Sequence, residues 1–221
     1  MYKTIKGTLP WADRTEWLLP SADKNTIDWP FTYGPTDIDP ALEMMDPYLK
    51  GKRTCIQAGG CIGIWPTRLS QVFEHVHCFE PEPVNFQCLK NNTAGIENLT
   101  LYESALGKES SLVHMELTPR MIGHCGAYQA KAGGDIPMIR IDDLNLPDVD
   151  LIYLDIEGGE YDALTGAMET INRDHPVIGI EDKGWNDPKF HPRSLLTSLG
   201  YRLLGAPNKA DKLYIHEATA P

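Results

Sequence analysis

The sequence predicts an α/β protein in which helices cover both faces of a mostly parallel sheet. From residue 53 onwards, short apolar runs alternate with amphipathic segments, which is the pattern of strands joined by crossover helices. Glycines or carboxylates follow several of the apolar runs. Because ligands of open α/β sheets bind at the carboxyl ends of the strands, we expect a site at that edge.

Residues 51–221 are predicted to form one domain with this architecture. Strands are expected at 53–60, 76–80, 99–104, 111–117, 137–141, 150–156, 177–182, 201–205 and 212–216. Helices are expected at 65–75, 84–92, 161–171 and 192–199. The Gly-rich residues 121–135 between two of the strands are expected to form a mobile loop.

Residues 1–50 are predicted to form an irregular arm that ends in a short helix. The arm is rich in Pro, Trp and Asp, and no period of 2 or 3.6 residues is sustained. Its aromatic residues could pack on the core or cover an active site, and both readings stay open. These residues are Trp11, Trp17, Trp29 and Phe31. Asp39 and Pro40 suit the start of a helix over 39–49.

The composition argues against nucleic acid and membranes as partners. The chain has 31 acidic and 20 basic residues, a formal net charge of −11, so it offers no broad cationic surface to phosphates. No apolar run approaches the roughly 18 residues that span a bilayer. The N-terminal residues lack the apolar core of a secretory signal, so we expect a cytoplasmic protein.

The cysteines argue against a zinc site and are expected to be reduced. They are odd in number, and they show neither a C-x-x-C pair nor a histidine at ligand spacing. The five residues are Cys55, Cys61, Cys78, Cys88 and Cys125.

Two features at neighbouring strand ends suit a nucleoside. Residues 57–63 read QAGGCIG directly before a helix, and clustered glycines let the backbone approach a ligand. Glu80 ends the next strand, where a carboxylate can accept hydrogen bonds from both hydroxyls of a ribose. A glycine turn can also serve packing alone, and a glutamate can be a solvated surface group. Together they favour the adenosine half of a dinucleotide or S-adenosylmethionine site.

Further carboxylates gather at the same edge of the predicted sheet. Asp155 and Glu157 follow the apolar run DLIYL, and residues two apart on a strand share a face. The run VIGI ends likewise in Glu181 and Asp182. These acids favour one acidic pocket, and their oxygen atoms could alternatively hold Mg²⁺, although the spacing does not specify a metal.

Four segments, in this order, resemble the FkbM family of S-adenosylmethionine-dependent methyltransferases over about residues 50–183: FEPEPVNFQCLKNN, IRIDDL, DLIYLDIEGGEYDALTGA and PVIGIE. The resemblance implies the Rossmann-like class I methyltransferase fold, with a mostly parallel seven-stranded sheet and an antiparallel terminal strand. It also implies S-adenosyl-L-methionine as cofactor and O-methylation of a sugar, a glycan or another small molecule.

The resemblance further implies roles for individual residues. The loop 57–63 would hold the methionine end of the cofactor, Glu80 the ribose, and Ser104 with Ala105 the adenine. Asp155 would lie near the methyl group, with Glu157 opening toward the acceptor. The implied cofactor-binding residues are Gln57, Gly59, Gly60, Gly63, Glu80, Pro81, Ser104, Ala105 and Asp155.

Three positions depart from the family pattern. Gln57 stands where an acid is usual, Cys61 where the glycine loop has an asparagine-like residue, and Tyr153 where a lysine is common. The amide of Gln57 can still accept a hydrogen bond from an ammonium group. Without a charge, that contact is weaker than the one a carboxylate makes.

Methyl transfer to a hydroxyl group also needs a base. The candidates are Glu157, which ranks first, Asp155 and Glu181 at the sheet edge, and His124 in the Gly-rich loop. An exposed loop residue is the simpler interpretation of His124.

Two other functions are compatible with parts of the sequence. Ala58-x-Gly60-x-x-Gly63 with Glu80 is close to a dinucleotide fingerprint and would suit an NAD-dependent oxidoreductase. That function leaves the D-x-E-G-x-E segment without a role. A nucleoside-binding module that has lost catalysis would also explain the changes at Gln57 and Cys61.

Overall fold

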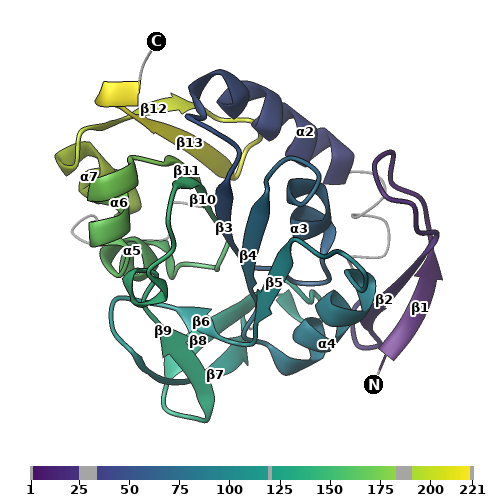
Figure 1. The fold of residues 1–221 in the computed structure, drawn as a ribbon. Helices are drawn as coiled ribbons and strands as arrows, with labels where there is room; N and C mark the ends of the chain where they lie inside the picture. The colour runs from purple at the N-terminus through teal and green to yellow at the C-terminus, as the bar shows by residue number, and fades with distance from the viewer. Residues whose placement is uncertain (1, 25–33, 119–120, 183–190, 220–221) are drawn as a thin grey trace.

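The computed structural model describes residues 2–24, 34–118, 121–182 and 191–219 (Figure 1). A seven-stranded sheet runs through its centre in the order β12-β13-β11-β10-β3-β4-β5. The strands are β3 (Thr54–Ala58), β4 (His75–Phe79), β5 (Leu99–Tyr102), β10 (Val149–Leu154), β11 (Val177–Glu181), β12 (Tyr201–Gly205) and β13 (Asp211–His216). Adjacent strands from β11 to β5 pair in parallel, and β13 runs antiparallel to both its neighbours, β11 and β12. The predicted fold class is confirmed.

Helices cover both faces of this sheet. They are α2 (Gly34–Met45), α3 (Ile64–Leu69), α4 (Pro83–Asn92), α5 (Glu160–Thr165), α6 (Met168–Asp174) and α7 (Pro192–Ser198). Short 3-10 helices occupy Asp46–Tyr48, Asp142–Leu144 and Glu217–Thr219. No helix in the described part of the chain is long and apolar enough to cross a bilayer.

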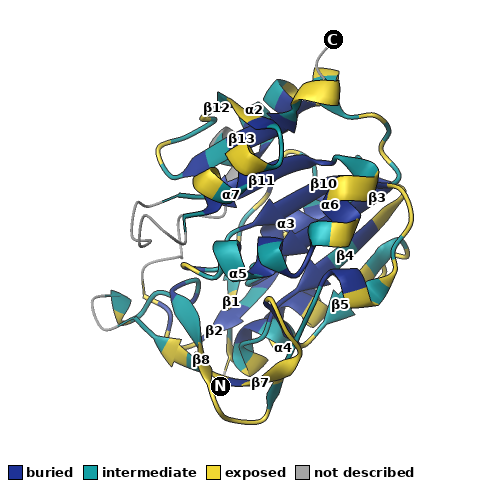
Figure 2. Cartoon of the chain, turned by 90° about the vertical axis from the view of Figure 1, so that its left-hand side faces the viewer, coloured by how far each residue is buried: buried dark blue, intermediate teal, exposed yellow. Residues whose placement is uncertain are grey.

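The core forms two layers because successive side chains of a strand point to opposite faces. Cys55 and Tyr153 pack in the cluster that contains residues of α2 and α3. Ile56 and Ile152, their neighbours along β3 and β10, pack in the cluster that contains residues of α5, α6 and α7. The central strands are therefore buried on both faces, and exposed residues lie on the outer sides of the helices and at loops (Figure 2).

A second sheet lies beside the main one and corrects the expected mobile loop over 121–135. Its order is β6-β9-β7-β8, with β6 (Ala105–Leu106), β7 (Ser111–Leu117), β8 (Tyr128–Ala132) and β9 (Ile136–Ile139). Residues 128–132 pair antiparallel with β7. Their sequence, YQAKA, alternates apolar and polar residues, a short strand pattern that the glycines around it outweighed. The pairing with β7 orders this segment.

Three expected helices have different bounds. The helix expected over 39–49 is α2, with Pro40 inside it, because Ile38, Ala41, Leu42 and Met45 form one buried stripe. The helix expected over 65–75 ends at Leu69, since His75 already belongs to β4. The helix expected over 161–171 breaks at Gly166, where a Cβ would lie 2.1 Å from the carbonyl oxygen of Gly107.

The N-terminal arm contains a hairpin that packs on the core. Strands β1 (Tyr2–Lys6) and β2 (Glu16–Pro20) pair antiparallel beside α4 (Figure 1). The side-chain amide of Asn92 accepts from the backbone N–H of Leu18 and donates to its carbonyl oxygen, both at 2.8 Å. Trp17 is fully buried, so this part of the arm is core and not irregular. The expected aromatic contacts of Trp29 and Phe31 lie outside the described residues.

Replacing Trp17 should therefore destabilise the whole protein. We expect Trp17→Ala to lower the free energy of unfolding by about 3–5 kcal/mol, the usual cost of a large cavity in a core. Tyr2, on the same hairpin, is 44% exposed, and Tyr2→Ala should change the free energy by less than about 0.5 kcal/mol. Urea unfolding of both variants measures the difference, and equal values would show that the hairpin is not part of the core.

Candidate functional site

Two adjoining cavities open at the carboxyl ends of the central strands. Their volumes are about 350 and 250 Å³, so the larger falls within the usual range of small-molecule sites, about 300–1,000 Å³. Both are lined by Gly59, Cys61, Gly126, Asp155 and Glu157. The cavities therefore meet where the turn after β3 faces the end of β10.

The turn after β3 brings bare backbone to the wall of both cavities. Gly59 has a φ of +86°, and a Cβ there would lie 1.9 Å from the carbonyl oxygen of Asp155. The N–H groups of Gly59 and Gly60 both donate to the carbonyl oxygen of Phe79, at 3.0 Å. Gly60 lines the smaller cavity only, whereas Gly63 lines neither and begins α3 with a φ of 98°.

Glu80, which lines the larger cavity with Pro81, is a buried carboxylate that can accept further hydrogen bonds. Its Oε2 accepts from the N–H of Cys61 at 2.7 Å, and its Oε1 accepts from the N–H of Glu82 at 2.9 Å. Burial raises the pKa of Glu80 to about 7. Each carboxylate oxygen has a second lone pair, so both can still accept from hydroxyl groups of a ligand.

Gln57 is not where the sequence suggested. Its side chain is buried, and its Nε2 donates to the carbonyl oxygens of Ala58 and Gly59, both at 3.1 Å. Its Oε1 accepts from the thiol of Cys78 at 3.0 Å. Gln57 lines neither cavity, so it holds the glycine turn in shape and its side chain does not reach a ligand.

Tyr153, at the position where the resemblance implies a lysine, also lines neither cavity. Its ring packs on Trp65 with centroids 4.2 Å apart, and its hydroxyl donates to Asp211 at 2.8 Å. Gly179 on the adjacent β11 leaves room for the ring, since a Cβ there would lie 2.3 Å from it. The substitution is accommodated by packing within the core.

The acidic segment after β10 divides into two roles. Asp155 and Glu157 line both cavities, although β10 ends at Leu154 and Glu157 sits in a turn with a φ of 54°. Glu160 is buried, and its Oε1 accepts from the N–H groups of Ile156 and Gly158, at 3.1 and 3.3 Å. Asp155 and Glu157 therefore reach the cavities from the turn that Glu160 holds, and not from a regular strand.

Glu181, at the end of β11, completes an acidic cluster in the smaller cavity. One carboxylate oxygen from each of Asp155, Glu157 and Glu181 lies within 4.8 Å of the others. Oxygen atoms at this spacing can bind a divalent cation or receive a proton.

His124 lines the smaller cavity from the loop before β8. Its Nδ1 is buried and has no hydrogen-bond partner among the residues that the structure describes. The loop is held from two sides, because the N–H of Lys24 donates to the carbonyl of Gly123 at 2.8 Å and Asn85 Nδ2 donates to that of Cys125 at 2.7 Å. The N-terminal arm and α4 thus position this histidine.

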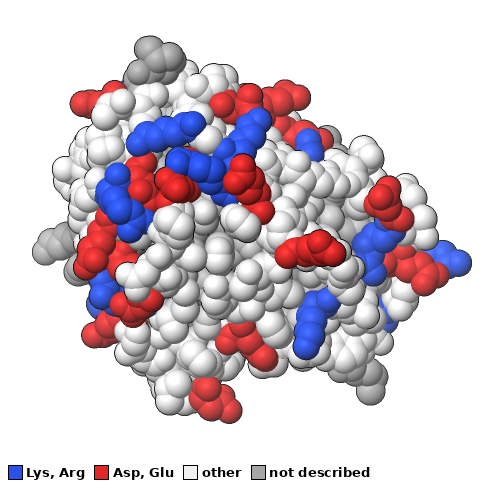
Figure 3. All heavy atoms as spheres, viewed as in Figure 1, with Lys and Arg blue, Asp and Glu red and all other residues white. Residues whose placement is uncertain are grey.

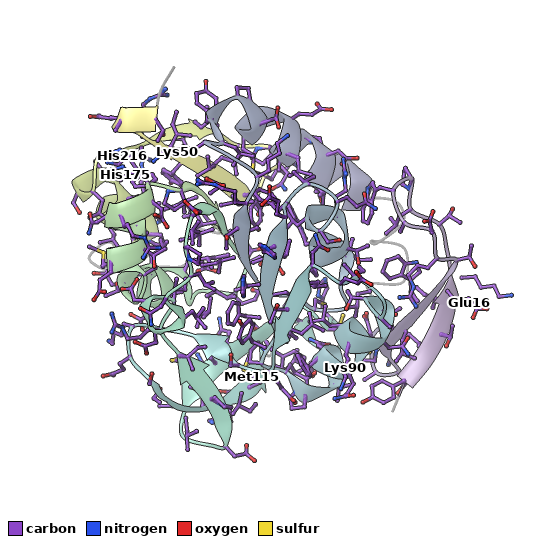
Figure 4. The ribbon with its side chains drawn as sticks, viewed as in Figure 1. Glu16, Lys50, Lys90, Met115, His175 and His216 are labelled. Carbon is purple, nitrogen blue, oxygen red and sulfur yellow. The ribbon has the colours of Figure 1, made fainter. Side chains whose placement is uncertain are left out.

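The larger cavity also contains polar atoms without partners. Ser104 Oγ and Asn85 Oδ1 are buried and make no hydrogen bond within the described residues. Ser104 and Ala105 line this cavity, and so do Met115 of β7, labelled in Figure 4, and Met138 of β9 from the second sheet. The sequence pattern did not identify Asn85, Met115 and Met138, because contacts between distant segments bring them to the site: α4 packs on the loop of Cys125, and β7 pairs with β9.

Comparisons with known proteins agree with this architecture. A model of the methyltransferase FkbM domain matches residues 57–203, and no curated protein matches the sequence. A methyltransferase FkbM from Methylobacillus flagellatus KT has 22% identity and a TM-score of 0.53, over 75% of this chain and 44% of that one. The Escherichia coli protein yhhF has 11% identity and a TM-score of 0.51, over 98% and 99%. This chain thus spans less than half of the Methylobacillus protein, and both likenesses show a shared fold.

The close approach at Gly59 makes a test of the site possible. Gly59→Ala must strain a positive φ and also displace the backbone of Asp155, so we expect severe destabilisation. Gly133 has the same φ of +86°, but no atom lies within 4 Å of the place that a Cβ would take. Gly133→Ala should therefore cost only the backbone strain, about 1–2 kcal/mol. Denaturant unfolding compares the two, and equal losses would contradict the proposed contact.

Proposed function

Because the chain belongs to the FkbM methyltransferase family, we propose that it transfers the methyl group of S-adenosylmethionine to a hydroxyl group of a sugar, a glycan or another small molecule. The observation that carries the proposal is that two cavities meet. One is lined by residues that can bind a nucleoside, and the other contains an acidic cluster. A cofactor in the first would present its reactive group where the two join.

The residues of the larger cavity fit an adenosine. Glu80 has lone pairs left for the ribose hydroxyls. The buried Ser104 Oγ, which has no partner within the described residues, can hydrogen-bond to the adenine ring. Gly59 lines this cavity with bare backbone, to which a ligand can come close. These features favour a nucleoside over an apolar ligand, because each unsatisfied polar atom costs free energy until a ligand bonds to it.

When bound, S-adenosylmethionine would supply a methyl group on a positively charged sulfur. The acceptor oxygen attacks the methyl carbon in line with the carbon–sulfur bond, and the sulfur is the leaving group. The smaller cavity suits the acceptor, since Ile62, Ile64, Trp65 and Met121 line one part of it and exclude water there. Glu157 is the first candidate for the base because it is only 7% exposed and lines both cavities. His124 is the second, with its buried Nδ1 as the acceptor of a proton.

A divalent cation is a second candidate for the acidic cluster. The three carboxylate oxygens of Asp155, Glu157 and Glu181 are close enough to bind one ion. Mg²⁺ takes oxygen ligands and would acidify an acceptor hydroxyl, replacing the need for a protein base.

A small acceptor fits the surface charge better than nucleic acid does. The net charge is −11, and on the face in Figure 3 basic side chains are interspersed with acidic ones. A nucleic-acid surface would need a continuous basic area.

Cofactor binding should depend on Glu80 and on pH. The carboxylate of Glu80 accepts hydrogen bonds from hydroxyl groups best when it is ionised, and its pKa is about 7. The affinity for S-adenosylhomocysteine should therefore be highest at a pH above 7 and fall as the pH drops through 7. Glu80→Gln should weaken binding by at least about tenfold, since hydrogen bonds to charged groups contribute about 1.5–3 kcal/mol, and should abolish this pH dependence. Isothermal titration calorimetry between pH 5.5 and 8 measures both effects.

The exposed Glu74 offers the matched control, and Glu74→Gln should bind as the unaltered protein does. Titration with NAD⁺ belongs in the same series. Binding of NAD⁺ without S-adenosylhomocysteine would overturn the proposal in favour of an oxidoreductase.

The base is tested by turnover. With radiolabelled S-adenosylmethionine and a panel of free sugars, glycosides and phenols, we expect Glu157→Gln to lower kcat by about 10²–10⁴, the usual range for a general base. His124→Gln should have a smaller effect, and Glu116→Gln, at an exposed position of β7, none.

The same assay with added Mg²⁺ or a chelator separates the two mechanisms. Loss of turnover with chelator would favour the cation at the acidic cluster, and an unchanged kcat for Glu157→Gln would exclude this residue as the base.

A further inference from the structure

Two cysteines distant in sequence meet at the wall of the cavities. The Sγ atoms of Cys61 and Cys125 are 3.4 Å apart, although 64 residues separate them along the chain. A disulfide bond has an S–S length of about 2.05 Å, so the two atoms are about 1.4 Å from bonding distance. The small movement required lies within the range of side-chain and loop adjustment.

Both cysteines belong to segments that shape the cofactor site. Cys61 lies in the glycine turn, lines both cavities, and donates its N–H to Glu80. Cys125 lines the larger cavity from the loop that carries His124, and its carbonyl accepts from Asn85. A bond between the two sulfurs would join one wall of the cavity to the opposite loop.

The other cysteines are less accessible. Cys55, Cys78 and Cys88 are fully buried, whereas Cys61 is partly exposed to the cavities. An oxidant that enters the cavities therefore meets the Cys61 thiol first. The hydrogen bond with Cys125 and burial raise the pKa of Cys61, so the reaction is slow at neutral pH and faster in alkaline solution.

We propose that Cys61 and Cys125 form a modification site at which a reversible disulfide ties the loop of His124 to the glycine turn of the cofactor cavity. Hydrogen peroxide transfers one oxygen to the Cys61 sulfur, which becomes a sulfenic acid, and its other oxygen leaves as water. The Cys125 sulfur then attacks the Cys61 sulfur and releases a second water, so two thiols and one peroxide give one disulfide and two waters. A thiol reductant restores both cysteines. The disulfide fixes the loop around Cys125 against the glycine turn and slows cofactor exchange, an effect that rests on the proposed function.

The first arm of the test is chemical. Reduced protein is treated with hydrogen peroxide at pH 8.5 and digested without reductant, and mass spectrometry should find the Cys61 and Cys125 peptides linked. The variant Cys55→Ala should give the same linked pair, and Cys125→Ser should not. If Cys125→Ser does not fold, Cys61→Ser is used in its place. Saturating S-adenosylhomocysteine should protect the pair. Absence of the linked peptide, while a reduced dithiol protein in the same tube is oxidised, overturns the proposal.

The second arm measures the consequence. Stopped-flow association of S-adenosylhomocysteine should be at least about tenfold slower after oxidation, because the tied loop and glycine turn can no longer adjust to an entering ligand, and dithiothreitol should restore the rate. Cys125→Ser should associate equally fast before and after peroxide. A disulfide that leaves the association rate unchanged would overturn the proposed effect on cofactor exchange. A reduced protein that binds no S-adenosylhomocysteine would instead refute the proposed function, while peptide mapping still decides whether the disulfide forms.

Discussion

The turn after β3 and the end of β10 approach so closely that no side chain fits between them. At Gly59 the carbonyl oxygen of Asp155 occupies the place of a Cβ, 1.9 Å from where that atom would lie. The parallel pairing of β3 with β10 leads both segments to the same edge of the sheet. The two cavities share this junction, so the position of every other group at the site depends on it.

Buried polar side chains keep the junction in shape. Gln57 holds the carbonyl groups of the glycine turn, and Glu160 holds the N–H groups of the turn that carries Glu157. Glu80 accepts two backbone N–H groups and keeps lone pairs for a ligand. A buried polar group is stable only when it is bonded, so these contacts restrict the turns to one arrangement. The chemistry is then left to the acids that face the cavities.

The second sheet and the N-terminal hairpin complete the site from outside the main sheet. Met115 and Met138 of the second sheet line the larger cavity, and Gln129 Nε2 donates to the carbonyl of Glu157 at 2.9 Å. The arm reaches the loop of His124 through Lys24. These contacts join parts of the chain that a parallel sheet alone would leave apart, and they order residues that a Gly-rich composition would leave mobile.

The central sheet and the edge that carries the site follow from local patterns in the sequence. Buried parallel strands are apolar runs bounded by glycine and acids, so the strands β3, β4, β10 and β11 and the nearby residues Gly59, Glu80, Asp155 and Glu181 could be predicted from local pattern. Contacts across the fold account for the rest: Gln57 turns inward to Cys78, α2 contains Pro40, residues 128–132 pair with β7, and Cys61 meets Cys125. Each of these depends on a partner distant in sequence, and the free energy of that contact overrides the local preference.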